Sequence, residues 1–182
     1  MSKKKVVFLP LKENHLEMVL AWRNKPEVRM NMYTSHEITL EEHTSWFERI
    51  SKDTSKFYFL AYLNEEPIGV VGFYDVNKDS KIAKWAFYAS PNAPRGSGAL
   101  MEYAALDYAF ISLKLYKLSC EVLSFNTSVV KLHTKFGFHI EGTHRDAFYD
   151  GENYHNIIYL GIFNSEWNQV RSELRKRLKL DQ

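Results

Sequence analysis

The stretch Arg95-Gly96-Ser97-Gly98 stands where a β-rich part of the sequence passes into a strongly helical run, residues 99–111. A glycine pair at such a junction lets the backbone approach an anion closely and leaves the first amides of the helix free to bind it. The helix dipole and the Arg95 side chain both favour a negative ligand. The turn therefore predicts a phosphate site, although such a turn can also do no more than begin a helix. No Lys-Ser or Lys-Thr pair follows, and the glycine spacing does not complete the dinucleotide fingerprint, so those two phosphate folds are disfavoured.

The sequence on either side of this turn predicts alternating strands and helices. Upstream, three β-rich runs separated by turn clusters predict an antiparallel meander, at residues 57–63, 68–76 and 82–89. Downstream come a strand at 117–123, a helix at 127–136, and strands at 138–149 and 153–163. The last two strands flank Asp150-Gly151, a strong hairpin signal. The pattern predicts an α/β domain with a mixed, mostly antiparallel central sheet of about seven strands flanked by helices.

The remaining helices are predicted from their capping residues. After a short strand at residues 6–9, Asn14 can cap the first helix, and Ser165 can cap the last. Thr39 followed three residues later by Glu42 is a capping box for the helix between them. The inward stripe of that helix is expected to begin at Leu40.

The composition limits what the chain can be. With 182 residues, 45% of them hydrophobic, the chain can bury one domain, residues 1–182, and is too short for two ordinary ones. Its 24 basic and 22 acidic residues are interleaved and leave a net charge of +2, so no overall field points to nucleic acid or a membrane as a partner. A single cysteine, Cys120, excludes an internal disulfide and a cysteine metal cluster. We therefore expect a cytoplasmic protein without a metal, since the apolar run at 6–9 is also too short for a signal peptide.

The segment 126–138 gives the glycine turn its meaning. It begins at an asparagine, runs through a predicted helix and ends at Gly-Phe. Together with the Gly-Ser-Gly upstream, it resembles the GNAT superfamily of N-acetyltransferases, in which a Gly-x-Gly loop precedes one helix and an Asn-initiated helix ends in Gly-Phe further on. The resemblance implies acetyl-CoA as the cosubstrate, with its pyrophosphate on the glycine turn.

Two departures from the family pattern bear on the site. Ala93 stands where the loop usually begins with Gln or Arg, which shifts pyrophosphate binding toward Arg95 and the backbone amides. His133 stands where the family usually has a tyrosine, the general acid. An imidazole can also donate a proton to the leaving CoA thiolate. In the alternative reading, His133 is a partly buried residue that only hydrogen-bonds, and a water supplies the proton.

The resemblance also implies the other parts of the site. Residues 87–89 splay from residues 117–123, so that a free backbone amide polarises the thioester carbonyl. Glu121 is the candidate for deprotonating the acceptor amine through a water, or is merely an outward-facing carboxylate. Cys120 is expected in the core and not as a nucleophile, because nothing nearby in sequence would lower its pKa. The residues expected to contact acetyl-CoA are Phe87, Tyr88, Ala89, Arg95, Gly96, Ser97, Gly98, Ala99, Asn126 and Lys131.

Further stretches, among them residues 22–29 and 118–123, resemble one branch of the superfamily, the acetyltransferases of pseudaminic acid biosynthesis that serve flagellin glycosylation. The resemblance implies a UDP-linked 4-amino-4,6-dideoxy-N-acetyl-altrosamine as acceptor, acetylated at its 4-amino group by direct attack in a ternary complex. A diphosphate and a base call for cations and aromatic faces. The candidates are Arg23, His43, Tyr74 and Lys84, although each cation can equally be a surface residue and His43 a core histidine.

Two other functions fit the same motifs. One is a protein N-terminal or ribosomal-protein acetyltransferase, for which a more acidic groove is expected. The other is a non-catalytic acyl-CoA-binding module, for which the histidine in place of tyrosine is the sequence hint. The basic residues of the last helix are interpreted as a solvated face, because no aromatic platform for nucleic acid accompanies them. The sequence leaves the oligomeric state open, a homodimer included.

Overall fold

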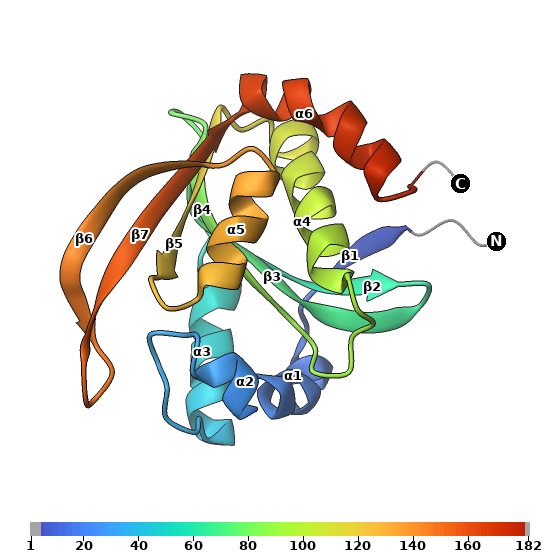
Figure 1. Ribbon diagram of the computed structural model, residues 1–182. Coiled ribbons are helices and arrows are strands. Elements are labelled where there is room, and N and C mark those ends of the chain that lie inside the picture. Colours follow the sequence, from blue (N-terminus) through green and yellow to red (C-terminus); the bar gives the residue numbers. More distant parts are fainter. Residues whose placement is uncertain (1–4, 181–182) are drawn as a thin grey trace.

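The computed structural model describes residues 5–180, so the first lysines of the chain lie outside the described residues. Figure 1 shows one central sheet with helices packed on it. The strands are β1 (Val6–Pro10), β2 (Phe57–Leu63), β3 (Glu66–Asn77), β4 (Ile82–Ala89), β5 (Lys117–Leu123), β6 (His139–Tyr149) and β7 (Tyr154–Phe163). The helices are α1 (Leu16–Arg23), α2 (Pro26–Arg29), α3 (Leu40–Lys52), α4 (Ser97–Asp107), α5 (Thr127–Lys135) and α6 (Asn164–Arg177), with a 3₁₀ turn at Glu13–His15 and a π turn at Tyr108–Ser112.

The sheet confirms the predicted fold class. Within the described chain it has seven strands in the order β1-β2-β3-β4-β5-β7-β6. Neighbouring strands run antiparallel except for β4 and β5, which are parallel and are joined through α4. The meander β2-β3-β4 on one side and β5 with the hairpin β6-β7 on the other therefore meet only along the β4–β5 boundary.

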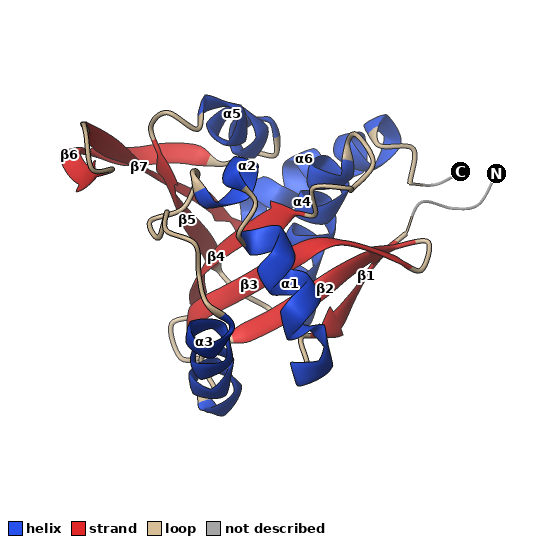
Figure 2. Ribbon diagram, turned by 90° about the horizontal axis from the view of Figure 1, so that it is seen from below, coloured by secondary structure: helices blue, strands red, loops and turns tan. Residues whose placement is uncertain are grey.

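Each face of the sheet has its own core, because side chains alternate between the two faces of a strand. Leu60 and Val70 face the side covered by α1 and α3, where they pack with Val19. Their neighbours Phe59 and Val71 face the other side. Figure 2 shows α1 and α3 on one face and α4 and α6 on the other. Helices therefore cover both faces of the sheet.

The predicted capping box and hairpin are confirmed. The Thr39 hydroxyl accepts a hydrogen bond from the Glu42 amide, and the Glu42 carboxylate accepts one from the Thr39 amide at 2.8 Å. The β6–β7 connection turns at Asp150, whose Oδ1 accepts hydrogen bonds from two following amides. Gly151 has a φ of +107°, which favours glycine at this position.

Several predicted helix details are wrong. Asn14 lies within the 3₁₀ turn and does not cap α1. Ser165 lies inside α6, where the Glu166 carboxylate instead accepts a hydrogen bond from the Phe163 amide at 2.8 Å. Leu40 is 49% exposed, so the buried stripe of α3 begins one turn later, at His43. A capping signal fixes a helix end only to within a turn, because neighbouring polar groups can take over the same amides.

None of the helices formed by residues 5–180 has the length and apolar character needed to cross a bilayer.

Candidate active site

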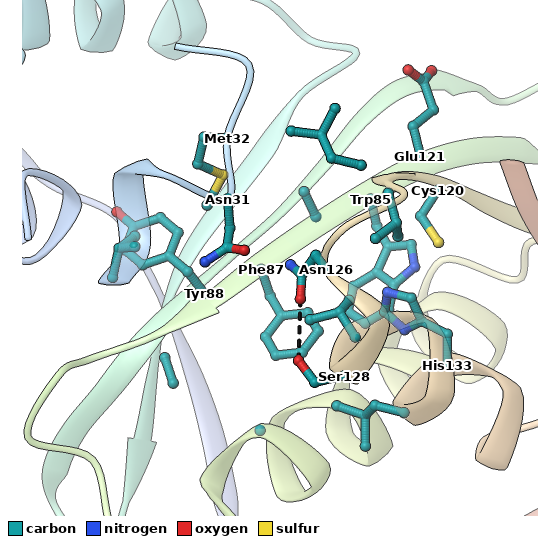
Figure 3. Close-up of a pocket in the computed structure, with 18 of the residues that line it drawn as sticks. Asn31, Met32, Trp85, Phe87, Tyr88, Cys120, Glu121, Asn126, Ser128 and His133 are labelled. Atoms are coloured by element: carbon teal, nitrogen blue, oxygen red, sulfur yellow. Dashed lines mark hydrogen bonds between the residues drawn. The ribbon is translucent and has the colours of Figure 1, made fainter. Parts of the chain in front are cut away.

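The site begins where β4 and β5 separate. The two strands pair only over Ile82–Lys84 and Lys117–Ser119. Past these residues the described strands diverge, as the family resemblance implied. A cleft of about 510 Å³ opens there, lined by the second half of β4, the second half of β5, the first turns of α5 and the loop after α2. Figure 3 shows the side chains that converge on it.

The open edge of β4 presents backbone amides to this cleft. The Ser90 amide donates to the Ile68 carbonyl on β3 at 2.7 Å. Because N–H groups alternate between the two edges of a strand, the amides of Phe87 and Ala89 point away from β3, toward the cleft. Phe87, Tyr88 and Ala89 all line it. A carbonyl oxygen placed in the splay can accept a hydrogen bond from this edge.

The glycine turn forms the start of α4, two residues earlier than predicted. Gly96 is its N-cap with a φ of +92°, a left-handed conformation that glycine adopts without strain. The amides of Ser97 and Ala99 donate to the carbonyls of Pro94 and Gly96. Within the described chain the Gly98 amide has no such partner, and Gly98 lines the cleft. A built-on Cβ at Gly98 would point between Phe87 and Leu132, so the bare backbone faces the cleft.

Arg95 lies beside this turn as an exposed side chain, and it is not among the residues that line the cleft. The Ser97 hydroxyl donates to the Pro94 carbonyl at 2.7 Å, so it braces the loop. A pyrophosphate bound at the N-terminal end of α4 would therefore accept a hydrogen bond from the free Gly98 amide and be stabilised by the helix dipole. The Arg95 side chain would lie at the rim of this site. This donor set fits the phosphate end of acetyl-CoA.

His133 comes from α5 and lies at the inner end of the cleft. Its Nδ1 is 2.8 Å from Oε1 of Glu102 on α4, and both side chains are buried. The Cys120 thiol on β5 lies next to the ring (Figure 3). Burial lowers the pKa of the His133 imidazole, but its hydrogen bonds with Cys120 and Glu102 more than offset this and raise the pKa to about 10. These two neighbours therefore favour the protonated imidazole, the form that is able to act as a proton donor.

Glu121 lies on the opposite wall of the cleft, on β5. Its Oε1 accepts a hydrogen bond from the Lys84 ammonium at 3.1 Å, and its Oε2 accepts one from the Tyr33 hydroxyl at 2.9 Å. The hydrogen bond with Glu121 raises the pKa of Lys84. Burial and the bond to Glu121 raise the pKa of Tyr33, and burial raises that of Tyr74, which also lines the cleft. Glu121 thus faces the cleft, with both carboxylate oxygens already bonded.

Arg23 lies near Tyr88, and His43 lies near Arg23, but neither residue lines the cleft. One Arg23 nitrogen donates to the Thr34 carbonyl at 3.0 Å, while its Nη1 and the His43 Nε2 are buried without a partner among the described residues. The His43 ring stacks on Trp46 at 5.1 Å between centroids. Burial, and then the Arg23 charge, lower the pKa of His43. His43 therefore has the surroundings of a core histidine, and the Arg23 guanidinium holds the loop after α2.

The other predicted cofactor residues lie on α5. Asn126 is its N-cap and lines the cleft, where its Oδ1 accepts a hydrogen bond from the Ser128 hydroxyl at 3.1 Å (Figure 3). Lys131 is exposed and does not line the cleft. The predicted acetyl-CoA residues that line the cleft are Phe87, Tyr88, Ala89, Gly98 and Asn126, and those that do not are Arg95, Gly96, Ser97, Ala99 and Lys131.

The sequence reasoning missed three residues of the site. Tyr33 bonds to Glu121, Glu102 bonds to His133, and Trp85 lines the cleft with its indole N–H buried and unpaired within residues 5–180. Glu102 could have been noticed as a carboxylate in an otherwise apolar part of a helix, since a buried charge needs a partner. Cys120 was expected in the core and is buried, but it also lines the cleft. No group of three or more His, Cys, Asp or Glu side chains suited to a metal occurs in the described chain.

The splayed strands, the free amide at the start of α4 and the proton donor on α5 define an acyl-CoA transferase site. A family model described as "Acetyltransferase (GNAT) domain" matches residues 5–139. The chain belongs to the GNAT acetyltransferase family, and it is an acetyl-CoA-dependent N-acetyltransferase.

Three acetyltransferases of known name are similar to this chain in sequence or in structure. "Acetyltransferase PseH" of Campylobacter jejuni subsp. jejuni (strain 81-176) is 32% identical over 142 residues, which cover 78% of this chain and 88% of that protein. "Spermidine N(1)-acetyltransferase" of Escherichia coli (strain K12) is 26% identical over 160 residues, covering 87% of this chain and 86% of that one. A solved spermidine N-acetyltransferase from Vibrio cholerae, in complex with CoA and spermine, has a TM-score of 0.83 at 20% identity and covers 90% of this chain and 98% of its own.

Proposed function

We propose that this protein transfers the acetyl group of acetyl-CoA to the 4-amino group of a UDP-linked 4-amino-4,6-dideoxy-N-acetyl-altrosamine, a step of pseudaminic acid biosynthesis. The observation that carries the proposal is the 32% identity to Acetyltransferase PseH over most of both chains. It agrees with the sequence resemblance to the acetyltransferases of that pathway.

The acceptor side of the cleft supports this choice. The Glu121 carboxylate lines the cleft, its Oε1 is paired with Lys84 and its Oε2 accepts a hydrogen bond from Tyr33, so this wall offers a polar group for an amine. Tyr33, Tyr74 and Tyr88 add aromatic faces and phenol groups. A sugar with a nucleoside diphosphate can use all of these, through stacking and charge-assisted hydrogen bonds.

The proposed mechanism is a direct attack in a ternary complex. The acceptor amine forms a C–N bond to the thioester carbonyl carbon, and the carbonyl oxygen accepts a hydrogen bond from one of the outward amides of β4, that of Phe87 or that of Ala89. The C–S bond then breaks, and His133 donates the proton that the leaving CoA thiolate takes up. The amine gives up its own proton through a water to Glu121, and His133 regains a proton from solvent.

Acetyl-CoA fits this arrangement at both ends. Gly98, Asn126 and Arg95 would hold the pyrophosphate region, and the gap between β4 and β5 would take the pantetheine arm. The bound thioester supplies the activated acetyl group. The protein orients it, polarises it and supplies the proton.

One observation favours a second candidate, a polyamine as the acceptor. The carboxylates that line the cleft are Glu27 and Glu121, and the cations Arg23 and Lys84 are absent from its lining. A polycationic amine would gain from Glu27. Because the chain is also 26% identical to a spermidine acetyltransferase, polyamines are included in the test below.

The deciding experiment measures CoA release with a panel of UDP-amino-sugars, a panel of polyamines and a panel of peptide N-termini. We expect turnover with the UDP-4-amino sugar and a kcat/KM at least tenfold above that for spermidine. Turnover confined to polyamines or to peptides would contradict the sugar proposal. Glu27→Gln serves as the internal check, because it should weaken a polyamine acceptor and leave a UDP-sugar unaffected.

A further inference from the structure

The least expected feature of the site is a carboxylate buried behind its proton donor. Glu102 lies in the second turn of α4, fully buried, and only its Oε1 has a hydrogen-bond partner within the described chain. That partner is His133 Nδ1, from a different helix, at 2.8 Å. Burying a carboxylate is energetically unfavourable unless it is paired, so the pairing of Glu102 with His133 calls for a functional explanation.

We infer that Glu102 is a positioning residue: it fixes the His133 ring through Nδ1 and keeps it protonated, so that the Nε2–H, which lies beside Cys120 at the inner end of the cleft, is available to the departing CoA sulfur. This inference rests on the general-acid role proposed above for His133.

The geometry supports this division between the two ring nitrogens. An imidazole whose Nδ1 donates to a carboxylate has its other nitrogen on the far side of the ring. Since Nδ1 bonds to Glu102, the hydrogen bond of the ring with Cys120 uses Nε2. The Cys120 thiol lies next to the ring (Figure 3), and both residues line the cleft. The rings of Trp85, Phe87 and Phe138 pack around the imidazole at 5.1–6.1 Å between centroids and leave it no freedom to turn away.

The electrostatic surroundings support it as well. Of the groups that face the imidazole, the titratable ones are Glu102 from α4 and Cys120 from β5, and the β4 and β6 sides contribute aromatic rings. Both titratable groups raise the pKa of His133. Burial raises the pKa of Glu102, while its bond with His133 opposes this. Both neighbours therefore favour the imidazolium, the form of His133 that can donate a proton.

The pair also ties two halves of the site together. The first turn of α4 offers its free amide to the cofactor phosphate, and the next turn carries Glu102. Helix α4 thus binds the phosphate end of the cofactor at its first turn and holds the proton donor His133 through Glu102 at its second turn. The separation of the two groups is therefore fixed by one rigid helix.

The test is a pH titration of His133 by NMR with isotope-labelled histidine, in the wild type and in Glu102→Gln, with the His133 signal identified by its loss in His133→Phe. We expect His133 in the wild type to stay protonated well above pH 8. In Glu102→Gln its midpoint should fall by about 1–3 pH units, the usual effect of removing a neighbouring opposite charge. Asp107→Asn is the matched control, because it neutralises another carboxylate of α4 that bonds to Arg171 and Trp167 instead.

Activity gives the second readout. The basic limb of the kcat–pH profile should move down by the same amount in Glu102→Gln, while the acetyl-CoA KM stays within about twofold. An unchanged His133 midpoint, or a loss of stability and a raised KM without movement of the basic limb, overturns the inference. If Glu102→Gln does not fold, a wild-type His133 that titrates at or below pH 6.5 overturns it equally. The NMR titration of His133 is carried out without an acceptor, so its result does not depend on which acceptor the enzyme uses. An error in the proposed acceptor would appear only in the CoA-release assay with the panels of acceptors.

Discussion

Replacing Gly98 with alanine should stabilise the protein and weaken acetyl-CoA binding. Gly98 is the second residue of α4, and its φ lies outside the left-handed range. An added Cβ meets only Leu132 and Phe87, each at 3.8 Å, which is ordinary van der Waals contact. Alanine should therefore gain up to about 1 kcal/mol of helix propensity. For a domain of this size that corresponds to about 2–4 °C in Tm.

The effect on the cofactor should have the opposite sign. Within the described chain the Gly98 amide is a free donor at the start of α4, and Gly98 lines the cleft. A methyl group there keeps an anion from reaching the amide. A hydrogen bond to a charged group contributes about 1.5–3 kcal/mol, so the apparent acetyl-CoA KM should rise about 10- to 100-fold.

The assay combines steady-state CoA release at varied acetyl-CoA with a thermal melt of the same preparation. Gly142→Ala is the matched control, since Gly142 lies on edge strand β6 with open space around its Cβ position. The control should leave KM unchanged. An unchanged KM in a stable Gly98→Ala protein would refute the assignment of the phosphate site, and a lower Tm would refute the packing argument.

Three further predictions follow from the same site. Arg95→Ala should raise the apparent acetyl-CoA KM several-fold with little loss of kcat, because the side chain is exposed at the rim of the phosphate turn; a large loss of kcat at constant KM would contradict this. Tyr33→Phe removes one donor to the Glu121 carboxylate and should lower kcat/KM for the acceptor by about 5- to 30-fold, a loss of about 1–2 kcal/mol, with the acetyl-CoA KM as the unaffected comparison. The raised His133 pKa predicts that its contribution to the free energy of unfolding is complete below about pH 6.5 and is lost as the pH rises toward about 10; urea titrations across this range should show the decline, and a flat profile would count against the buried ion pair.

The fold could be predicted well because its signals are local. The bounds of β2, β4 and β5 agree with the predicted ranges, since strand-forming runs bounded by turns are visible in a short window. The glycine turn and the asparagine at the start of α5 were likewise visible as short motifs. Helix ends were less accurate, as Asn14 and Ser165 show, because several nearby groups can satisfy the same amides.

The functional site could be predicted only in part from these motifs. The sequence by itself determined which residues are chemically able to act, such as His133 and Glu121, and the family in which they act. Only the tertiary structure decided their partners: Glu102 for His133 across 31 positions, and Tyr33 for Glu121 across 88. The physical reason is that a side chain's hydrogen bonds and pKa depend on groups brought near it by packing, and here the separation of β4 from β5 and the contact of α4 with α5 choose those groups.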